Sequence, residues 1–210
     1  MIISIPGIVS QGGVDVNKSL VYQLPSATTF NGTSTYIDTG IKLFDTPKDF
    51  TIFVDFNDAG TRTHFDTVYH CMYEGTINGY DYPGHSFDYR NFTSSPRYAG
   101  YCMIVSPGGY WKGTGLVSVG TNIRSAVVFK NGVFSNWVWS MNYGTPTSDF
   151  VEVGASGLPA VPNYVSHSVP LAIGCYRDAQ GRRGRYWQGR INDFRVWERA
   201  LSDTEVNTLF

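Results

Sequence analysis

The chain has 210 residues, enough to bury the core of one β-rich domain without disulfide cross-links. Its net charge of −1 argues against a global positive field that would attract nucleic acid or an anionic membrane. Only 16% of the residues are charged, whereas 15% are aromatic and 23 are glycine, a balance typical of short strands joined by tight turns.

The cysteines and the first residues indicate the compartment in which the chain folds. Cys71, Cys102 and Cys175 form no C-x-x-C pair, and their odd number argues against a disulfide framework or a zinc site. The start, MIISIPGIVSQGG, lacks the basic and long apolar stretches of a signal peptide. No apolar run reaches the length of a membrane span. We therefore expect cytoplasmic synthesis and no membrane insertion.

Residues 1–23 predict an N-terminal arm or linker, because their glycines and scattered apolar residues show no period. From residue 24 onward strand signals dominate. ATTFNGTSTYIDTG predicts a short strand, a turn at Asn31-Gly32 and a second strand around Tyr36-Ile37.

Two central segments predict longer strands. DFTIFVDFND places Phe50, Ile52, Val54 and Phe56 on one face and Phe53 on the other, which is typical of a strand inside a two-layer sandwich. RSAVVFKNGVFSNWVWS predicts a hairpin, because Asn131-Gly132 suits a tight turn between two strand-like runs.

The C-terminal segments predict more strands and then a helix. VPLAIGCYRD is strand-like, and a loop rich in glycine and arginine follows it. In RINDFRVWERA, Ile191 is out of phase with Phe194 and Val196, so we expect a β-bulge near Asn192-Asp193.

The last ten residues carry the signature of a helix N-terminus. Ser202 and Glu205 form a capping-box pattern, and Leu201 with Val206 forms a hydrophobic staple. Together the segments predict an all-β, antiparallel sandwich with a short C-terminal helical turn.

The C-terminal run resembles the ending of laminin-G-like domains, which have the concanavalin-A-like jelly-roll fold. The matching residues are Ile173, Gly174, Gly189, Ile191, Asp193, Phe194, Arg195, Val196, Trp197, Arg199, Ala200, Leu201, Ser202 and Glu205. FNGTSTYIDTG and DFTIFVDF resemble the opening strands of the same family. The resemblance implies a concanavalin-A-like antiparallel jelly-roll sandwich over residues 24–210.

Catalysis is not expected. Some enzymes of the concanavalin-A-like class use two clustered carboxylates on one strand, and retaining chemistry needs them about 5 Å apart. Here the glutamates are scattered, at Glu74, Glu152, Glu198 and Glu205. His70 and Cys71 would point to opposite faces of a strand, which predicts a buried cysteine beside a surface histidine and no thiolate–imidazole pair.

Aromatic residues in the middle of the chain are the candidate ligand-binding residues. The belt from Asn78 to Tyr101 mixes tyrosines with Asp, Arg, Asn and Gly, and SPGGYWKGTG predicts an exposed turn. Aromatic faces and planar polar groups suit a pyranose ring, so we expect saccharide or partner contact at Tyr80, Tyr82, Tyr89, Tyr110 and Trp111. The alternative is that these aromatic residues fill a sandwich edge or a subunit contact.

Charged residues leave two further questions open. Seven arginines lie between Arg177 and Arg199 and could recognise an anionic glycan, or could be solvated loop residues. The family resemblance also leaves a structural calcium open, with Asp38 and Asp193 as the acids within family-like motifs. No other cofactor is expected, and the metal ligands are unknown.

The function expected from these features is a non-catalytic binding or adhesion module, carbohydrate-binding and lectin-like. The starting Met, the lack of a secretion signal and the arm favour a virion or phage component, as a decoration or tail-associated protein. Its partners would be a cell-surface glycan or other virion proteins, with homo-oligomers left open. The alternative is a structural protein whose aromatic loops contact other subunits without a glycan. An excised domain of a larger secreted protein also stays open.

Overall fold

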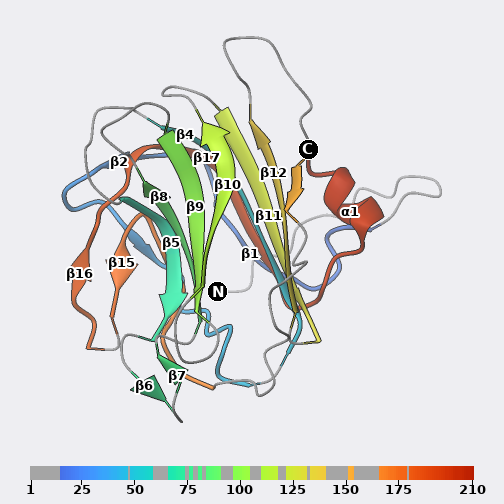
Figure 1. The fold of residues 1–210 in the computed structure, drawn as a ribbon, viewed down its shortest axis with the longest axis horizontal. Helices are drawn as coiled ribbons and strands as arrows, with labels where there is room; N and C mark the ends of the chain where they lie inside the picture. The colour runs from blue at the N-terminus through green and yellow to red at the C-terminus, as the bar shows by residue number, and fades with distance from the viewer. Residues whose placement is uncertain are drawn as a thin grey trace.

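The computed structural model describes residues 15–46, 48–58, 66–73, 76–77, 80–81, 84–90, 97–104, 110–117, 122–131, 133–140, 151–153, 166–178 and 180–210. In these residues two antiparallel sheets pack face to face, and one short helix lies outside them (Figure 1). The all-β antiparallel sandwich predicted from the sequence is confirmed.

Seven strands form the first sheet, in the order β1-β17-β4-β11-β12-β13 with β2 also paired to β17. Their bounds are β1 Leu20–Gln23, β2 Thr28–Asn31, β4 Phe50–Asp58, β11 Asn122–Lys130, β12 Val133–Ser140, β13 Val151–Val153 and β17 Gln188–Trp197. The predicted hairpin is β11–β12, in which Lys130 pairs with Val133 and Asn131 takes the left-handed conformation, with φ of 50°.

Six strands form the second sheet, in the order β10-β9-β8-β5-β14-β3. Their bounds are β3 Ile37–Asp38, β5 Asp66–Met72, β8 Gly84–Arg90, β9 Arg97–Ile104, β10 Tyr110–Val117 and β14 Ala172–Ile173. Two small hairpins stand apart from both sheets: β6 Thr76–Ile77 with β7 Tyr80–Asp81, and β15 Tyr176–Arg177 with β16 Arg183–Gly184.

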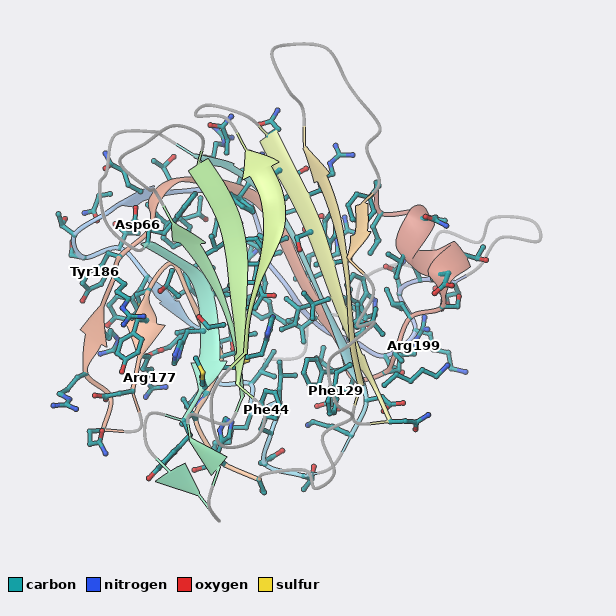
Figure 2. The ribbon with its side chains drawn as sticks, in the orientation of Figure 1. Phe44, Asp66, Phe129, Arg177, Tyr186 and Arg199 are labelled. Carbon is teal, nitrogen blue, oxygen red and sulfur yellow. The ribbon has the colours of Figure 1, made fainter. Side chains whose placement is uncertain are left out.

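The core lies between the two sheets. As the alternation predicted, Phe50, Ile52, Val54 and Phe56 of β4 belong to this core, where they meet residues of the six-stranded sheet such as Tyr69 and Phe87. Phe44 and Phe129 close its lower end in the view of Figure 2, with ring centroids 6.3 Å apart.

The other face of β4 is covered by the C-terminal helix. Phe53 packs in a second cluster with Trp197, Leu201 and Val206, next to helix α1 (Asp203–Asn207). A strand with aromatic residues on both faces is therefore explained by a sheet on one side and a helix on the other. No helix in the described part of the chain has the length and hydropathy of a membrane span.

Two local predictions are confirmed at the C-terminus. The register of β17 against β4 shifts between Ile191 and Asp193, and this bulge brings Ile191 and Phe194 into the core. Ser202 caps α1: its hydroxyl accepts from the Glu205 amide at 3.3 Å, and the Glu205 carboxylate accepts from the Ser202 amide at 2.8 Å.

The segment VPLAIGCYRD is not one strand, as the sequence suggested. It forms β14 in the six-stranded sheet and β15 in a separate hairpin, divided at Gly174. Gly174 has φ of 79°, and a Cβ there would clash with the Phe30 ring, so only glycine fits this break.

The predicted arm is partly docked on the sandwich. Residues 20–23 form β1, which pairs with β17, so the seven-stranded sheet begins before residue 24, where the sequence placed the boundary. In the turn that precedes β1, the backbone oxygen of Val16 accepts a 2.5 Å hydrogen bond from Trp197 Nε1. Residues 1–14 of the predicted arm lie outside the described residues.

Candidate functional site

One row of residues crosses the six-stranded sheet from edge to edge. The register aligns Asp38 of β3, Ala172 of β14, His70 of β5, Ser86 of β8, Cys102 of β9 and Trp111 of β10. The neighbours of His70 on β5, Tyr69 and Cys71, belong to the core between the sheets. Ala172, His70 and Ser86, which alternate with core residues, therefore lie on the outer face of the sheet.

The β15–β16 hairpin covers one end of this outer face. The Tyr176 ring lies 4.7 Å from the His70 ring, and the Arg185 guanidinium lies 5.1 Å from the Tyr176 ring. At the edge strand, Asp38 contacts Arg177 at 3.7 Å and Arg183 at 2.6 Å. Ring packing and ion pairs together hold the hairpin on the sheet.

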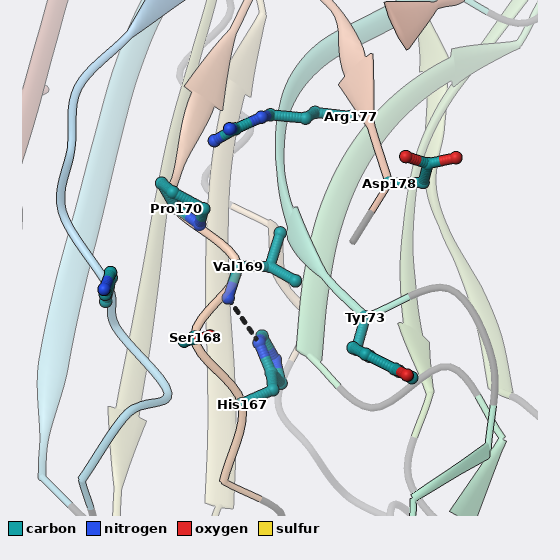
Figure 3. Close-up of a pocket in the computed structure, with 8 residues that line it drawn as sticks. Tyr73, His167, Ser168, Val169, Pro170, Arg177 and Asp178 are labelled. Atoms are coloured by element: carbon teal, nitrogen blue, oxygen red, sulfur yellow. Dashed lines mark hydrogen bonds between the residues drawn. The ribbon is translucent and has the colours of Figure 1, made fainter. Parts of the chain in front are cut away.

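A cavity of about 490 Å³ opens beside this hairpin, a size within the range of small-molecule sites. It is lined by Lys42, Tyr73, His167, Ser168, Val169, Pro170, Arg177 and Asp178. Figure 3 shows Arg177 and Asp178 on one side of it, and Tyr73 and His167 on the other. These residues come from four separate segments of the chain.

Packing fixes the imidazole of His167. Its ring stacks on Phe44 with centroids 5.0 Å apart, and its Nδ1 accepts from the Val169 amide at 3.4 Å (Figure 3). Gly84 of β8 makes room for it: a Cβ there would lie 2.9 Å from His167 Nε2 and 2.5 Å from the Cys71 carbonyl oxygen. One aromatic wall of the cavity is thereby held in place.

The acidic wall of the cavity is held by an arginine. The Asp178 side chain is 2% exposed, and its carboxylate accepts from Arg182 Nε at 2.5 Å and from the Arg182 amide at 2.8 Å. Burial alone would raise the pKa of Asp178, but the bonds and charge of Arg182 outweigh it and keep that pKa below its ordinary value. Asp178 is thus an anion at neutral pH and suits hydrogen bonding better than proton transfer.

The cavity also has a cationic side. Lys42 is exposed, and the Arg177 side chain is 21% exposed, so both can meet a ligand from solvent. Ammonium and guanidinium groups beside two rings and a carboxylate can bind a polar molecule that carries hydroxyls and an anionic group.

The residues predicted as the ligand site occupy three different strands. Tyr89 lies on β8, and Tyr110 with Trp111 opens β10, so these two begin an edge strand and not the tip of the predicted turn. Tyr80 lies on β7, in the separate β6–β7 hairpin. Tyr82 lies outside the described residues.

The structure corrects the interpretation of His70. It is 1% exposed and buried under Tyr176, and was not predicted to be covered. Cys71 is buried as predicted, and its thiol donates to the His85 carbonyl oxygen at 3.2 Å. Because burial raises the pKa of this thiol far above its ordinary value, Cys71 is a packing residue.

Most of the clustered arginines are paired with acids. Arg182 pairs with Asp178, Arg183 with Asp38, Arg195 with Asp193 and Arg199 with Glu205. Asp38 and Asp193, the acids considered for calcium, both face arginines. Among the residues that the structure describes, no three His, Cys, Asp or Glu side chains form a metal-binding group.

Sequence reasoning missed Lys42, Tyr73 and His167. None of them stands in a motif. They come together through contacts between segments that are far apart in the sequence. Only Tyr73 lies near the aromatic belt that the composition singled out.

No protein-family model and no curated protein matches the chain. Among solved structures, the CBM40 of Ruminococcus gnavus IT-sialidase bound to α2,3-sialyllactose has a TM-score of 0.54 and 14% identity, over 90% of this chain and 98% of that one. The heptameric SAP-like pentraxin of Limulus polyphemus has a TM-score of 0.53 and 13% identity, over 94% and 83%.

The NanB sialidase of Streptococcus pneumoniae in complex with 2-[(3-chlorobenzyl)ammonio]ethanesulfonate matches with a TM-score of 0.56 and 15% identity. The match covers 90% of this chain but only 28% of the sialidase chain, so this chain corresponds to a part of that enzyme's length. These likenesses show the fold: an antiparallel, concanavalin-A-like jelly-roll sandwich. Membership of the laminin-G-like family stays a prediction.

Proposed function

We propose that the chain is a non-catalytic carbohydrate-binding module that holds a saccharide in the cavity beside the β15–β16 hairpin. The observation that carries this proposal is the cavity itself: about 490 Å³, with two aromatic rings, two cations and a buried carboxylate around it. The likeness to a CBM40 bound to α2,3-sialyllactose supports the same class of ligand.

Different lining residues of the cavity suit different parts of a sugar. The half-buried Tyr73 ring offers an apolar face to the C–H surface of a pyranose ring, and the buried His167 imidazole, stacked on Phe44, closes the wall beside it. Lys42 and Arg177 favour a sugar that carries a carboxylate, since guanidinium groups match carboxylate geometry. The Ser168 hydroxyl can donate or accept hydrogen bonds with sugar hydroxyls, while Asp178, bonded to Arg182, holds the wall behind it.

Absence of catalysis is part of the proposal. Glycosidic hydrolysis needs a carboxylic acid with a raised pKa opposite a second carboxylate. Asp178 has a lowered pKa and is bound to Arg182, so it is poorly suited to donate a proton.

The aromatic site predicted from the sequence, Tyr80, Tyr82, Tyr89, Tyr110 and Trp111, is a competing location for the saccharide. Trp111 occupies the cross-strand row that contains His70, so both hypotheses use the six-stranded sheet. Substitutions separate them: Trp111→Ala should abolish binding only if the predicted site is correct.

The experiment is a glycan array, with and without calcium, followed by calorimetric titration of α2,3-sialyllactose. Lys42→Ala and Arg177→Ala should each weaken binding about fivefold or more, by loss of a charge-assisted hydrogen bond. Lys130→Ala is the matched control, because Lys130 is an exposed lysine at the end of β11 in the other sheet. Wild-type-like affinity of both cavity variants, or no glycan bound by the parent, would overturn the proposal.

Display on a virion or phage particle is the finer part of the proposal. A single site that relies on one stacked ring binds weakly, and many copies on one particle would raise its avidity. Detection of the chain by mass spectrometry in purified particles would support this setting. A stable oligomer in light scattering with no glycan bound would favour the structural alternative.

A further inference from the structure

We propose that Tyr36, Tyr186 and Arg183 form a second saccharide subsite next to the cavity, so that the module binds an oligosaccharide across both. We call these three residues the rim patch. This inference rests on the proposed function and adds the length of its ligand: two or three sugar units, with an acidic sugar in the cavity and a neutral one on the rim patch.

Two aromatic rings meet at the rim patch in a solvent-facing position. Tyr36 is 38% exposed, and it and Val21 are the two exposed large hydrophobic residues in the described part of the chain. The Tyr186 ring centroid lies 6.5 Å from that of Tyr36, with the ring planes tilted by 46°. Exposed Tyr36 and half-buried Tyr186 together offer apolar area with polar hydroxyls, as in many binding surfaces.

Arg183 fixes the Tyr36 ring. Its guanidinium lies 4.2 Å above the ring centroid, and its Nη2 donates to Asp38 at 2.6 Å. The hydrogen bond to Asp38, which outweighs the effect of burial, raises the pKa of Arg183, so this cation stays charged over the working pH range. A ring held in place before binding costs little ordering entropy when a ligand arrives.

The rim patch is continuous with the cavity. Arg177, which lines the cavity, contacts Oδ1 of Asp38 at 3.7 Å, while Arg183 of the rim patch contacts Oδ2 of the same carboxylate. The Asp38 carboxylate therefore links a residue of the cavity to a residue of the rim patch. Figure 2 shows Tyr186 and Arg177 on the same side of the molecule, beside β15 and β16.

Strand β5 supports both the rim patch and the cavity. Tyr186 forms a bridge with Thr67 of β5, and β5 runs on to Met72, immediately before Tyr73 in the cavity wall. Because β5 lies inside the six-stranded sheet, the distance between the rim patch and the cavity is set by a rigid element. A fixed separation lets one ligand of matching length contact both places without ordering the scaffold first.

The test compares a monosaccharide with a trisaccharide. Calorimetry would measure the affinity of the parent, Tyr36→Ala and Tyr186→Ala for free sialic acid and for α2,3-sialyllactose. We expect each variant to bind sialyllactose about five- to tenfold more weakly, the loss of one stacked ring, with affinity for free sialic acid within about twofold of the parent. Val21→Ala, an exposed apolar residue on β1, is the matched control and should change neither affinity.

The outcomes separate this inference from the proposed function. If the parent binds sialyllactose no more tightly than sialic acid, or both tyrosine variants bind sialyllactose like the parent, the rim patch is not a subsite although the cavity binds sugar. If the parent binds neither probe and nothing on the array, the proposed function itself fails. Unchanged sialic acid affinity also shows that each variant is folded.

Discussion

Replacing Glu205 with glutamine tests how the C-terminal helix is fastened to the sandwich. The Glu205 carboxylate accepts two hydrogen bonds from Arg199, at 2.6 and 2.9 Å, and one from the Ser202 amide at 2.8 Å. Arg199 also donates to the Lys18 carbonyl oxygen at 2.9 Å, so the same ion pair reaches the N-terminal turn. Glu205→Gln keeps the shape of the side chain and removes its charge.

The magnitude follows from the pKa of this carboxyl group. The hydrogen bonds from Arg199 lower the pKa of Glu205 to about 2, from an ordinary 4.5. A difference of this size corresponds to roughly 3 kcal/mol in favour of the charged form. Because the Arg199 side chain is 23% exposed, solvent screening reduces the expected loss of stability in Glu205→Gln to about 2 kcal/mol at pH 7.

The pH dependence has a definite sign. A carboxyl group with a lowered folded-state pKa stabilises the protein fully above its unfolded-state pKa and loses that contribution as pH falls through its folded-state pKa. The advantage of the parent over Glu205→Gln should therefore shrink by about 0.5 kcal/mol by pH 4 and by about 1 kcal/mol by pH 3, and the rest should be lost as the pH falls through the folded-state pKa.

Urea unfolding of both proteins at pH 7, 4 and 3 measures this difference. The matched control is Glu198→Gln, because Glu198 pairs with Lys48 but its side chain is 43% exposed, and it should cost about 0.5 kcal/mol or less. A Glu205→Gln loss equal to that of the control, or one that stays constant down to pH 3, would refute the reasoning.

Three more predictions concern stability. Burial lowers the pKa of His70 and His85 to about 3, whereas histidines of the unfolded chain take up protons below pH 6.5. Each histidine should therefore lower the free energy of unfolding by roughly 2 kcal/mol between pH 7 and pH 5. In urea titrations, His70→Phe should lose less stability than the parent over this pH range. Phe194→Ala should cost about 3–5 kcal/mol in the same assay, since Phe194 is fully buried between the sheets; a loss under about 1 kcal/mol would contradict this packing. Gly174→Ala should lower the melting temperature far more than Gly181→Ala, because both have positive φ but only the former Cβ meets a neighbour, the Phe30 ring.

The sequence predicts those parts of the fold that local patterns determine. The capping box at Ser202 and Glu205 needs only residues three apart, and the bulge near Asn192 follows from the phase of Ile191 against Phe194. Alternation in β4 identifies the core face, because successive side chains of a strand must point to opposite faces.

The candidate site could not be predicted in the same way, because it depends on contacts between distant segments. Lys42, Tyr73, His167 and Arg177 meet only after β5, β14 and β15 are placed side by side. His70 shows the same limit: nothing near it in the sequence indicates that Tyr176 will cover it. Composition pointed to aromatic residues as ligand contacts, but the described cavity uses different ones.

The hairpin that borders the cavity explains why fold and ligand are determined by different residues. The chain leaves the six-stranded sheet after β14, at Gly174, whose amide donates to the Val68 carbonyl oxygen, and returns at Arg185, whose carbonyl oxygen accepts from the Thr67 amide. Both residues have positive φ, so the excursion between them is closed at its base by backbone geometry. Arg177 and Asp178, within the excursion, are not part of the core between the sheets. The fold that this chain shares with a CBM40 at 14% identity therefore does not by itself determine a ligand, which depends on the side chains that this chain places on the hairpin.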